Sequence, residues 1–221
     1  MKSKILLFGF VFFLAFSFYS CESELEKQER LAKIERVRIE NEKQRAEEER
    51  LRKLKEEEDA RVRAIQEEKE RKEKEIYNRY INNSLRTGAT PYAYCYGSNS
   101  SCDDYGCSEI KVKTPSNSDV MVTIKKNGRV YRHAYIKAGS RYTFEFPNGT
   151  YQAFFYYGKG WNPNKFMKEA SCGTIRGGFV SDEHVSKDSP QQLNNSILTY
   201  ELILQQNGNF STRPSSVSEA F

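Results

Sequence analysis

The chain has 221 residues, long enough for one or two domains, and 29% of them are charged. Its formal net charge at pH 7 is +5, and the basic excess is spread along the chain. So weak and scattered an excess excludes the clustered basic face of a nucleic-acid-binding protein, and we expect no nucleic-acid partner.

Residues 1–20 have the composition of an export signal. Lys2 and Lys4 precede an almost unbroken apolar run over residues 5–18. A membrane-spanning helix needs roughly 20 apolar residues, so this run is short for one. We predict a signal peptide over residues 1–20, and the alternative is an uncleaved N-terminal membrane anchor. Either way, we expect the rest of the chain to lie outside the cytoplasm.

The sequence Phe-Tyr-Ser-Cys at residues 18–21 resembles the bacterial lipobox, where a lipid is attached to the cysteine and the preceding peptide is removed. The resemblance implies a lipoprotein-type signal peptide and acyl chains on Cys21. More than one chain is what stable anchoring requires. By the same resemblance, Glu22 does not argue for retention in the inner membrane. We therefore expect a lipid anchor in the outer membrane of a Gram-negative cell envelope, on the periplasmic or the surface face.

Residues 21–86 are predicted to form a long, charged helical spacer. They contain no Gly and no Pro, carry acidic and basic side chains in equal number, and are rich in strong helix formers. Acidic and basic residues recur at the favourable i,i+4 spacing, as in Glu48 and Arg52. We expect one helix over residues 24–85.

This helix has part of a coiled-coil pattern. Leu51, Leu54 and Ile65 fit the a and d positions of a heptad repeat, but Glu58 and Arg61 occupy other positions of the seam. Two interpretations stay open: a solvated single helix that acts as a spacer, and weak homo-oligomerisation through the helix. In both, the helix holds the C-terminal domain away from the membrane.

Four cysteines follow the predicted helix: Cys95, Cys102, Cys107 and Cys172. An even number of cysteines in a small exported domain predicts two disulfides, with three possible connectivities. Structural zinc sites use closely spaced CxxC pairs, which this sequence lacks, and neither histidine lies near the cysteines. We therefore expect no metal site.

Residues 87–221 change from helical periodicity to an alternation of period two, with turn signals at short intervals. Val122 and Ile124 share one face of a predicted strand, and Asn127-Gly128 is a strong hairpin signal. We count about seven such strands, which predicts an antiparallel, disulfide-bearing β-sandwich. With the preceding helix, the expected fold class is α+β.

The run from residue 122 to residue 155 reads VTIKKNGRVYRHAYIKAGSRYTFEFPNGTYQAFF. Its Gly-x-x-Tyr-x-Phe-x-x-Pro-x-Gly-x-Tyr rhythm resembles carboxypeptidase-regulatory-like and PEGA-type sandwich modules. That resemblance implies consecutive strands joined by short turns and an accessory or adhesive role without catalysis. The cysteines and residues 159–184 have no counterpart in it. The C-terminal domain as a whole also resembles uncharacterised bacterial lipoprotein domains.

No catalytic or cofactor-binding pattern is present in the sequence. His133 falls on the predicted polar face of a strand, and His184 ends a polar loop over residues 181–184, which we interpret as solvated surface. The glycines fit neither a phosphate-binding loop nor a dinucleotide fingerprint. We therefore expect a protein that has no cofactor and is not an enzyme. A hydrolase-type enzyme is the least favoured alternative.

Residues 151–161 contain six aromatic side chains. Alternation along a strand places three of them toward the core: Tyr151, Phe155 and Tyr157. The other three are the candidate ligand contacts: Phe154, Tyr156 and Trp161. The favoured interpretation is that residues 158–164 fold back and cover them, because exposed apolar patches are uncommon in monomers. The alternative is an aromatic platform for a glycan or a protein.

Together these features predict an envelope lipoprotein that presents a non-catalytic binding module on a helical spacer. Its partner is a protein or a glycan that the sequence does not identify. The alternative is a structural envelope protein that acts through self-association of the helix. An exposed Tyr156 and Trp161 would favour the binding module, whereas buried aromatic residues would favour the structural protein.

Overall fold

The structure, a computed structural model, describes residues 23–102, 106–203 and 212–221. The predicted signal peptide and Cys21 lie outside these residues. Among the described helices, none is long and apolar enough to cross a membrane. The chain divides into two compact units that meet between Glu68 and Lys69, so the last turns of the long helix belong to the same unit as the strands.

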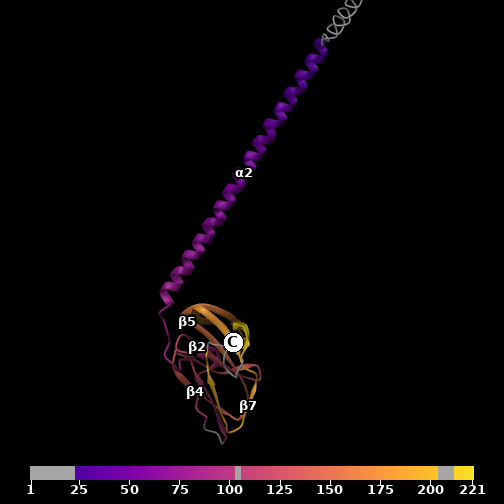
Figure 1. Ribbon diagram of the computed structural model, residues 1–221. Helices are drawn as coiled ribbons and strands as arrows, with labels where there is room; N and C mark the ends of the chain where they lie inside the picture. The colour runs from indigo at the N-terminus through magenta and orange to yellow at the C-terminus, as the bar shows by residue number, and fades with distance from the viewer. Residues whose placement is uncertain (1–22, 103–105, 204–211) are drawn as a thin grey trace, which may run out of the picture. The chain divides into compact units, whose positions relative to one another are not determined.

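Helix α2 runs from Glu24 to Tyr80 and contains 57 residues (Figure 1). It begins with a capping box: Glu26 N donates to the Ser23 hydroxyl at 3.3 Å, and Ser23 N donates to the Glu26 carboxylate at 3.2 Å. The absence of Gly and Pro lets the helix continue without interruption. The predicted long helix is confirmed, although it ends at Tyr80 rather than at residue 85. A turn follows Tyr80, in which Asn83 N donates a hydrogen bond to Tyr80 O.

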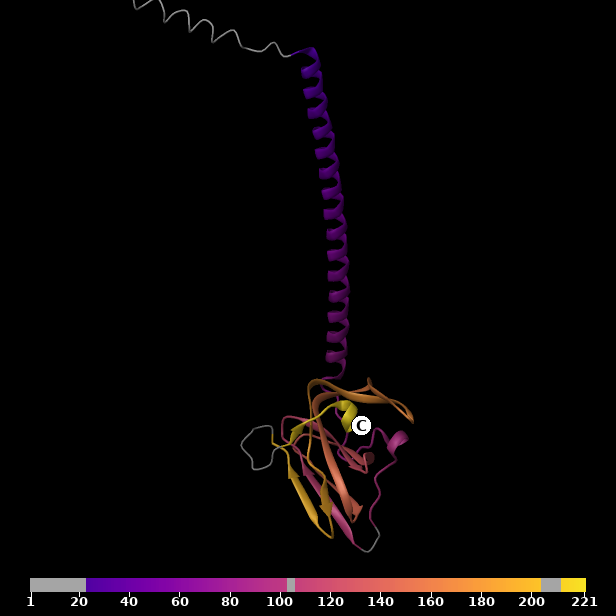
Figure 2. The same cartoon turned by 90° about the vertical axis from the view of Figure 1, so that its right-hand side faces the viewer.

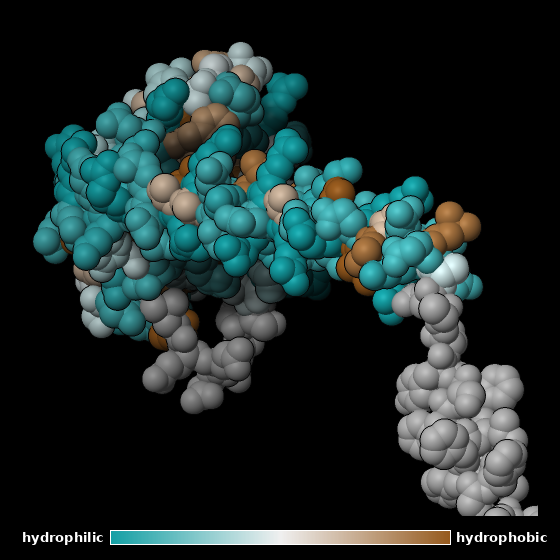
Figure 3. All heavy atoms as spheres, turned by 90° about the horizontal axis from the view of Figure 1, so that it is seen from above, coloured by the Kyte–Doolittle hydropathy of each residue, from teal (hydrophilic) through white to brown (hydrophobic). Residues whose placement is uncertain are grey.

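No residue of α2 is buried. Ion pairs between residues one turn apart stabilise the helix where it has no packing partner. Examples are Lys53 with Glu49 and Arg79 with Glu75, each with an N–O distance of 2.8 Å. Each contributes on the order of tenths of a kcal/mol, so many are needed along a helix of this length. On the face seen in Figure 3, hydrophobic side chains are separated by hydrophilic ones. The coiled coil stays a prediction.

The strands of the described residues form two sheets, which with helix α2 confirms the α+β class (Figure 1). The larger sheet has the order β3-β2-β5-β6-β9, with β3 Arg129–Ile136, β2 Asp119–Lys126, β5 Gly149–Ala170, β6 Gly173–Lys187 and β9 Arg213–Pro214. The smaller sheet has the order β4-β1-β8, with β4 Arg141–Pro147, β1 Cys107–Lys113 and β8 Ile197–Glu201. A short strand, β7 Gln191–Leu193, pairs with the start of β5. One pair departs from the antiparallel prediction, because β8 runs parallel to β1.

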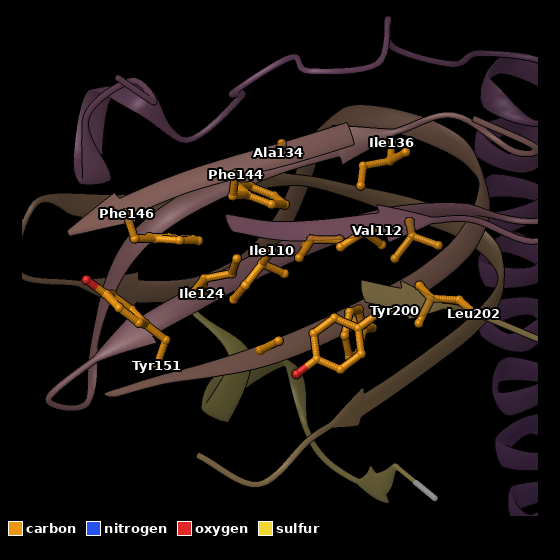
Figure 4. Packing of buried hydrophobic residues seen from close by; sticks show 14 of the residues in the cluster. Ile110, Val112, Ile124, Ala134, Ile136, Phe144, Phe146, Tyr151, Tyr200 and Leu202 are labelled. Atoms are coloured by element: carbon orange, nitrogen blue, oxygen red, sulfur yellow. The ribbon is translucent and has the colours of Figure 1, made fainter. Parts of the chain in front are cut away.

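A hydrophobic core fills the space between the two sheets (Figure 4). Strand β1 alternates half-buried and buried residues along its length, with Ile110 and Val112 on the buried face. Tyr151, Phe155 and Tyr157 lie in this core, as predicted. Burial of each large apolar side chain stabilises the fold by about 1.5–3 kcal/mol, so this cluster is the main source of cohesion between the sheets.

The turn between β2 and β3 is the predicted Asn127-Gly128 hairpin. Both residues have positive φ, 52° for Asn127 and 76° for Gly128, as a type I′ turn requires. The predicted covering loop over residues 158–164 is wrong, because this segment continues β5 as part of a long hairpin with β6. Local alternation did not indicate this, since glycines and Pro163 interrupt the pattern.

A second hydrophobic cluster lies on the other face of the larger sheet. Two segments cover it: the chain around helix α3 (Ala93–Tyr96), which contributes Tyr92, and helix α4 (Val217–Ala220), which is followed by Phe221. Figure 2 shows α4, in yellow, beside the orange strands β5 and β6. The sheet therefore has a buried face on both sides.

The two predicted disulfides are present and connect the four cysteines of the C-terminal region. Cys95 in α3 pairs with Cys172 in the turn between β5 and β6, with their Cα atoms 5.3 Å apart. Cys102 pairs with Cys107 at the start of β1, with a Cα separation of 6.0 Å. The first disulfide therefore attaches the covering segment to the long hairpin, and the second closes a short loop.

Candidate binding groove

The three aromatic residues singled out from the sequence do not form an exposed platform. Trp161 and Phe154 are each 2% exposed, and Tyr156 is fully buried. They belong to the second cluster, where the Trp161 ring packs edge-on against Tyr135 and Phe179 with ring centroids 5.3 and 5.4 Å apart. The structure therefore shows these three residues covered by other segments, as part of a hydrophobic core. This is the arrangement that the structural alternative predicts, and these three rings offer no surface to a ligand.

The hydroxyl of Tyr156 is tied into the fold rather than offered to a ligand. It donates to the Glu183 carboxylate and accepts a hydrogen bond from Phe179 N at 3.0 Å. Burial, with the Glu183 carboxylate adding to it, raises the pKa of Tyr156 well above its ordinary value. The side chain is therefore a neutral hydrogen-bond donor at physiological pH.

His133 was predicted on a polar face, and this prediction is wrong: the side chain is fully buried. The covering segment encloses it, with the Tyr92 ring stacked on the imidazole at a centroid distance of 5.6 Å. Its Nε2 accepts a hydrogen bond from Tyr92 N at 3.1 Å. Burial lowers its pKa to about 4, so the ring is neutral at pH 7.

His184 is exposed, as the polar-loop interpretation expected, although it lies on strand β6. Its ring lies beside Tyr157, with centroids 5.7 Å apart. In the described part of the chain, no group of three or more His, Cys, Asp or Glu residues has the arrangement of a metal site. Neither histidine thus belongs to a recognisable cluster of metal ligands.

A groove with a volume of about 730 Å³ lies between the last turns of α2 and the β5–β6 hairpin. This is within the roughly 300–1,000 Å³ of small-molecule sites. From α2 it is lined by Glu73, Ile76, Tyr77, Arg79 and Tyr80. From the hairpin it is lined by Asn162, Asn164, Lys165, Phe166, Phe179 and Val180. We call it the helix–hairpin groove.

Close backbone contacts hold the two walls of the groove together. Trp161 N donates to Asn83 O at 2.8 Å, and the Asn83 side-chain amide donates to Trp161 O at 2.6 Å. Gly160 lies against the end of the helix, where a Cβ atom would come within 2.6 Å of Ile81 Cα and 2.7 Å of Tyr80 O. The chain after α2 is thus bound to the sheet, and glycine is required at residue 160.

The groove combines apolar rings with amide groups. Tyr77 is 43% exposed and Phe166 is 56% exposed, large fractions for aromatic residues beside a hollow. Asn162 is only 8% exposed, and its Oδ1 accepts a hydrogen bond from Asn164 N at 2.9 Å. Its Nδ2 group has no hydrogen-bond partner among the described residues. Such a group is available to a ligand in the groove.

The charged residues of the groove are already paired. Lys165 binds the Glu183 carboxylate and also donates to Phe179 O at 2.6 Å. Arg79 binds Glu75 at 2.8 Å, as described above, and Glu73 lies 3.9 Å from Lys69. The groove therefore offers a ligand apolar surface and amide groups, but little uncompensated charge.

No local sequence pattern indicates this groove, because its walls come from segments about eighty or more residues apart. The aromatic residues at the end of α2, Tyr77 and Tyr80, were the available signal, since they follow a helix otherwise poor in aromatic side chains. Its counterpart on the hairpin, Phe166, lies two residues after the segment over residues 158–164 that we expected to fold back. Comparison with protein-family models, with curated proteins and with solved structures gave no match.

Proposed function

We propose that this protein is a lipid-anchored envelope protein that presents a non-catalytic binding module on a helical spacer. The lipobox-like sequence ending at Cys21 supports the anchor, and the paired cysteines agree with an oxidising compartment. The helix supports the spacer: at 1.5 Å per residue, α2 is about 85 Å long.

The observation that carries the binding function is the helix–hairpin groove. It replaces the buried aromatic residues as the candidate site. Tyr77 and Phe166 expose large parts of their rings beside the groove, and Asn162 has an amide donor without a hydrogen-bond partner among the described residues. The hydrogen bonds between Asn83 and the backbone N and O of Trp161 fix the two walls relative to each other. A preformed site costs less ordering entropy on binding than a site that must first assemble.

Site-specific photocrosslinking in intact cells tests the binding site. A benzophenone amino acid replaces Phe166 in the full-length chain, and a matched variant carries it at Ile197, which is 61% exposed on the smaller sheet. We expect an adduct from residue 166 and none from residue 197. Absence of an adduct at residue 166, or equal adducts at both positions, would contradict the proposed site.

Fractionation tests the anchor separately. We expect wild-type protein in the outer-membrane fraction and a Cys21→Ser variant lost from that fraction. A variant that still partitions entirely with membranes would show that acylation is not the anchor.

Self-association through α2 is the second candidate function. Leu54, Ile65 and Ile76 recur every 11 residues, and 11 residues make about three full turns of an α-helix. The three side chains therefore share one face, and each is between 44% and 65% exposed. An Ile65→Lys variant of the full chain tests this function: by sedimentation equilibrium, wild-type oligomers that dissociate in the variant would support it, and a monomeric wild type would exclude it.

A further inference from the structure

We propose that the helix–hairpin groove binds a neutral saccharide. This inference rests on the proposed binding function and identifies the ligand class for the same site. Three features of the groove carry it: the exposed aromatic rings, the amide groups beside them, and the pairing of the charged residues. Each matches one part of the chemistry of a sugar.

The aromatic rings fit the apolar side of a sugar. A pyranose ring presents a patch of C–H groups on one face, and such a patch packs against the face of a Tyr or Phe ring. Tyr77 and Phe166 line the groove from opposite walls and are 43% and 56% exposed. Tyr also supplies a polar tip that reaches water or a hydroxyl group. Each wall of the groove therefore supplies one ring on which a sugar can stack.

The amide groups fit the hydroxyl groups of a sugar. An Asn side chain carries two donors and one acceptor, and so can bind hydroxyl groups that act in either role. Asn162 is fixed in place by the hydrogen bond from Asn164 N, which leaves its Nδ2 donor unused. The Asn164 amide lies 3.5 Å from the Tyr80 hydroxyl, a weak contact that a ligand can replace. A purely apolar ligand would remove these groups from water without offering a partner.

The pairing of charges favours a neutral ligand over a strongly charged one. The Lys165 ammonium is held by both Glu183 and the Phe179 carbonyl. An anionic ligand would have to compete with Glu183 for Lys165 or with Glu75 for Arg79, and a cationic ligand with Lys69 for Glu73. A neutral ligand avoids this competition.

Isothermal titration calorimetry on the full-length chain tests the inference. The protein is purified in lauryldimethylamine oxide, because a detergent with a sugar headgroup would compete. The neutral probes are cellotetraose, maltotetraose, mannotetraose and chitotetraose, and the charged probes are tetragalacturonate and a heparin tetrasaccharide. We expect at least one neutral probe to bind and the charged probes to bind more weakly.

Variants assign the binding to the groove. Tyr77→Ala and Phe166→Ala are each expected to weaken binding about tenfold. Ile197→Ala, an exposed apolar side chain outside the groove, should leave the affinity unchanged. Because all three positions are exposed, the variants should fold, and equal unfolding midpoints confirm this.

Two outcomes overturn the inference and separate it from the proposed function. If no neutral probe binds while the crosslinker at residue 166 still forms its adduct, the groove is a binding site for another ligand class. If neither occurs, the groove is not the site. Equal binding of neutral and charged probes, or affinities unaffected by both ring substitutions, would also overturn it.

Discussion

Asn83 and Trp161 are joined by two hydrogen bonds in opposite directions. Trp161 N donates to Asn83 O at 2.8 Å, and Asn83 Nδ2 donates to Trp161 O at 2.6 Å. Trp161 is also part of the second hydrophobic cluster. One residue of β5 therefore connects the chain at the end of α2, the wall of the groove and the core behind the larger sheet.

An Asn83→Ala substitution should lower the free energy of unfolding by about 1 kcal/mol, because it removes the side-chain hydrogen bond to Trp161 O while the backbone bond remains. Urea unfolding followed by tyrosine and tryptophan fluorescence measures this. Asn164→Ala is the control, since Asn164 is exposed and makes only weak side-chain contacts. Equal stability of the two variants would contradict the structural role of Asn83.

A Gly160→Ala substitution should be more harmful than Gly128→Ala. Both glycines have positive φ, 69° and 76°, so each variant loses about 1–2 kcal/mol to backbone strain. A Cβ at residue 160 also meets the backbone of Tyr80 and Ile81, which adds about 1–3 kcal/mol, whereas a Cβ at residue 128 meets nothing within 4 Å. Chemical unfolding of both variants measures the difference, and an equal loss would show that the close approach is unimportant.

His133 should make stability depend on pH. Its pKa is lowered to about 4 in the folded protein from the ordinary 6.5, so the unfolded chain binds more protons between these values. The stability that comes from the neutral ring is complete above pH 6.5 and is lost as the pH falls toward 4. The full effect is about 3 kcal/mol. The groups that face the ring, Tyr92 and Tyr96, are uncharged in this range.

Unfolding free energies at pH 4.5 and pH 7.5 test this dependence. In a His133→Gln variant the amide oxygen can still accept from Tyr92 N, but nothing titrates at residue 133. We expect the wild type to lose stability at pH 4.5 and the variant to lose much less. The same loss in both proteins would assign the pH dependence to other groups.

The two disulfides should contribute unequally. Cys95 and Cys172 are 77 residues apart, and Cys102 and Cys107 are 5 apart. Loop closure in the unfolded chain predicts a loss of about 4.5 kcal/mol when the first pair is replaced by alanine and about 2 kcal/mol for the second. Unfolding of the two double variants gives the order, and a larger loss from the short loop would contradict this reasoning.

The sequence alone determined the features that depend on neighbouring residues. Helix α2 follows from good helix formers without Gly or Pro and from the Ser23–Glu26 capping box. The Asn127-Gly128 turn follows from the positive φ values that only a few residues accept. The core positions of Tyr151, Phe155 and Tyr157 follow from alternation along a strand. These are local preferences, and a local pattern is sufficient to recognise them.

The tertiary structure alone decided which distant segments meet. Alternation placed Phe154 and Tyr156 away from the main core, but only the folded chain shows Tyr92 and Phe221 covering that face. The tertiary structure likewise decided which cysteines pair and that the end of α2 lies opposite Phe166 in the groove. Contacts between segments tens of residues apart form when the apolar surface that they bury outweighs the entropy lost in closing the loop between them. No local sequence pattern records that balance.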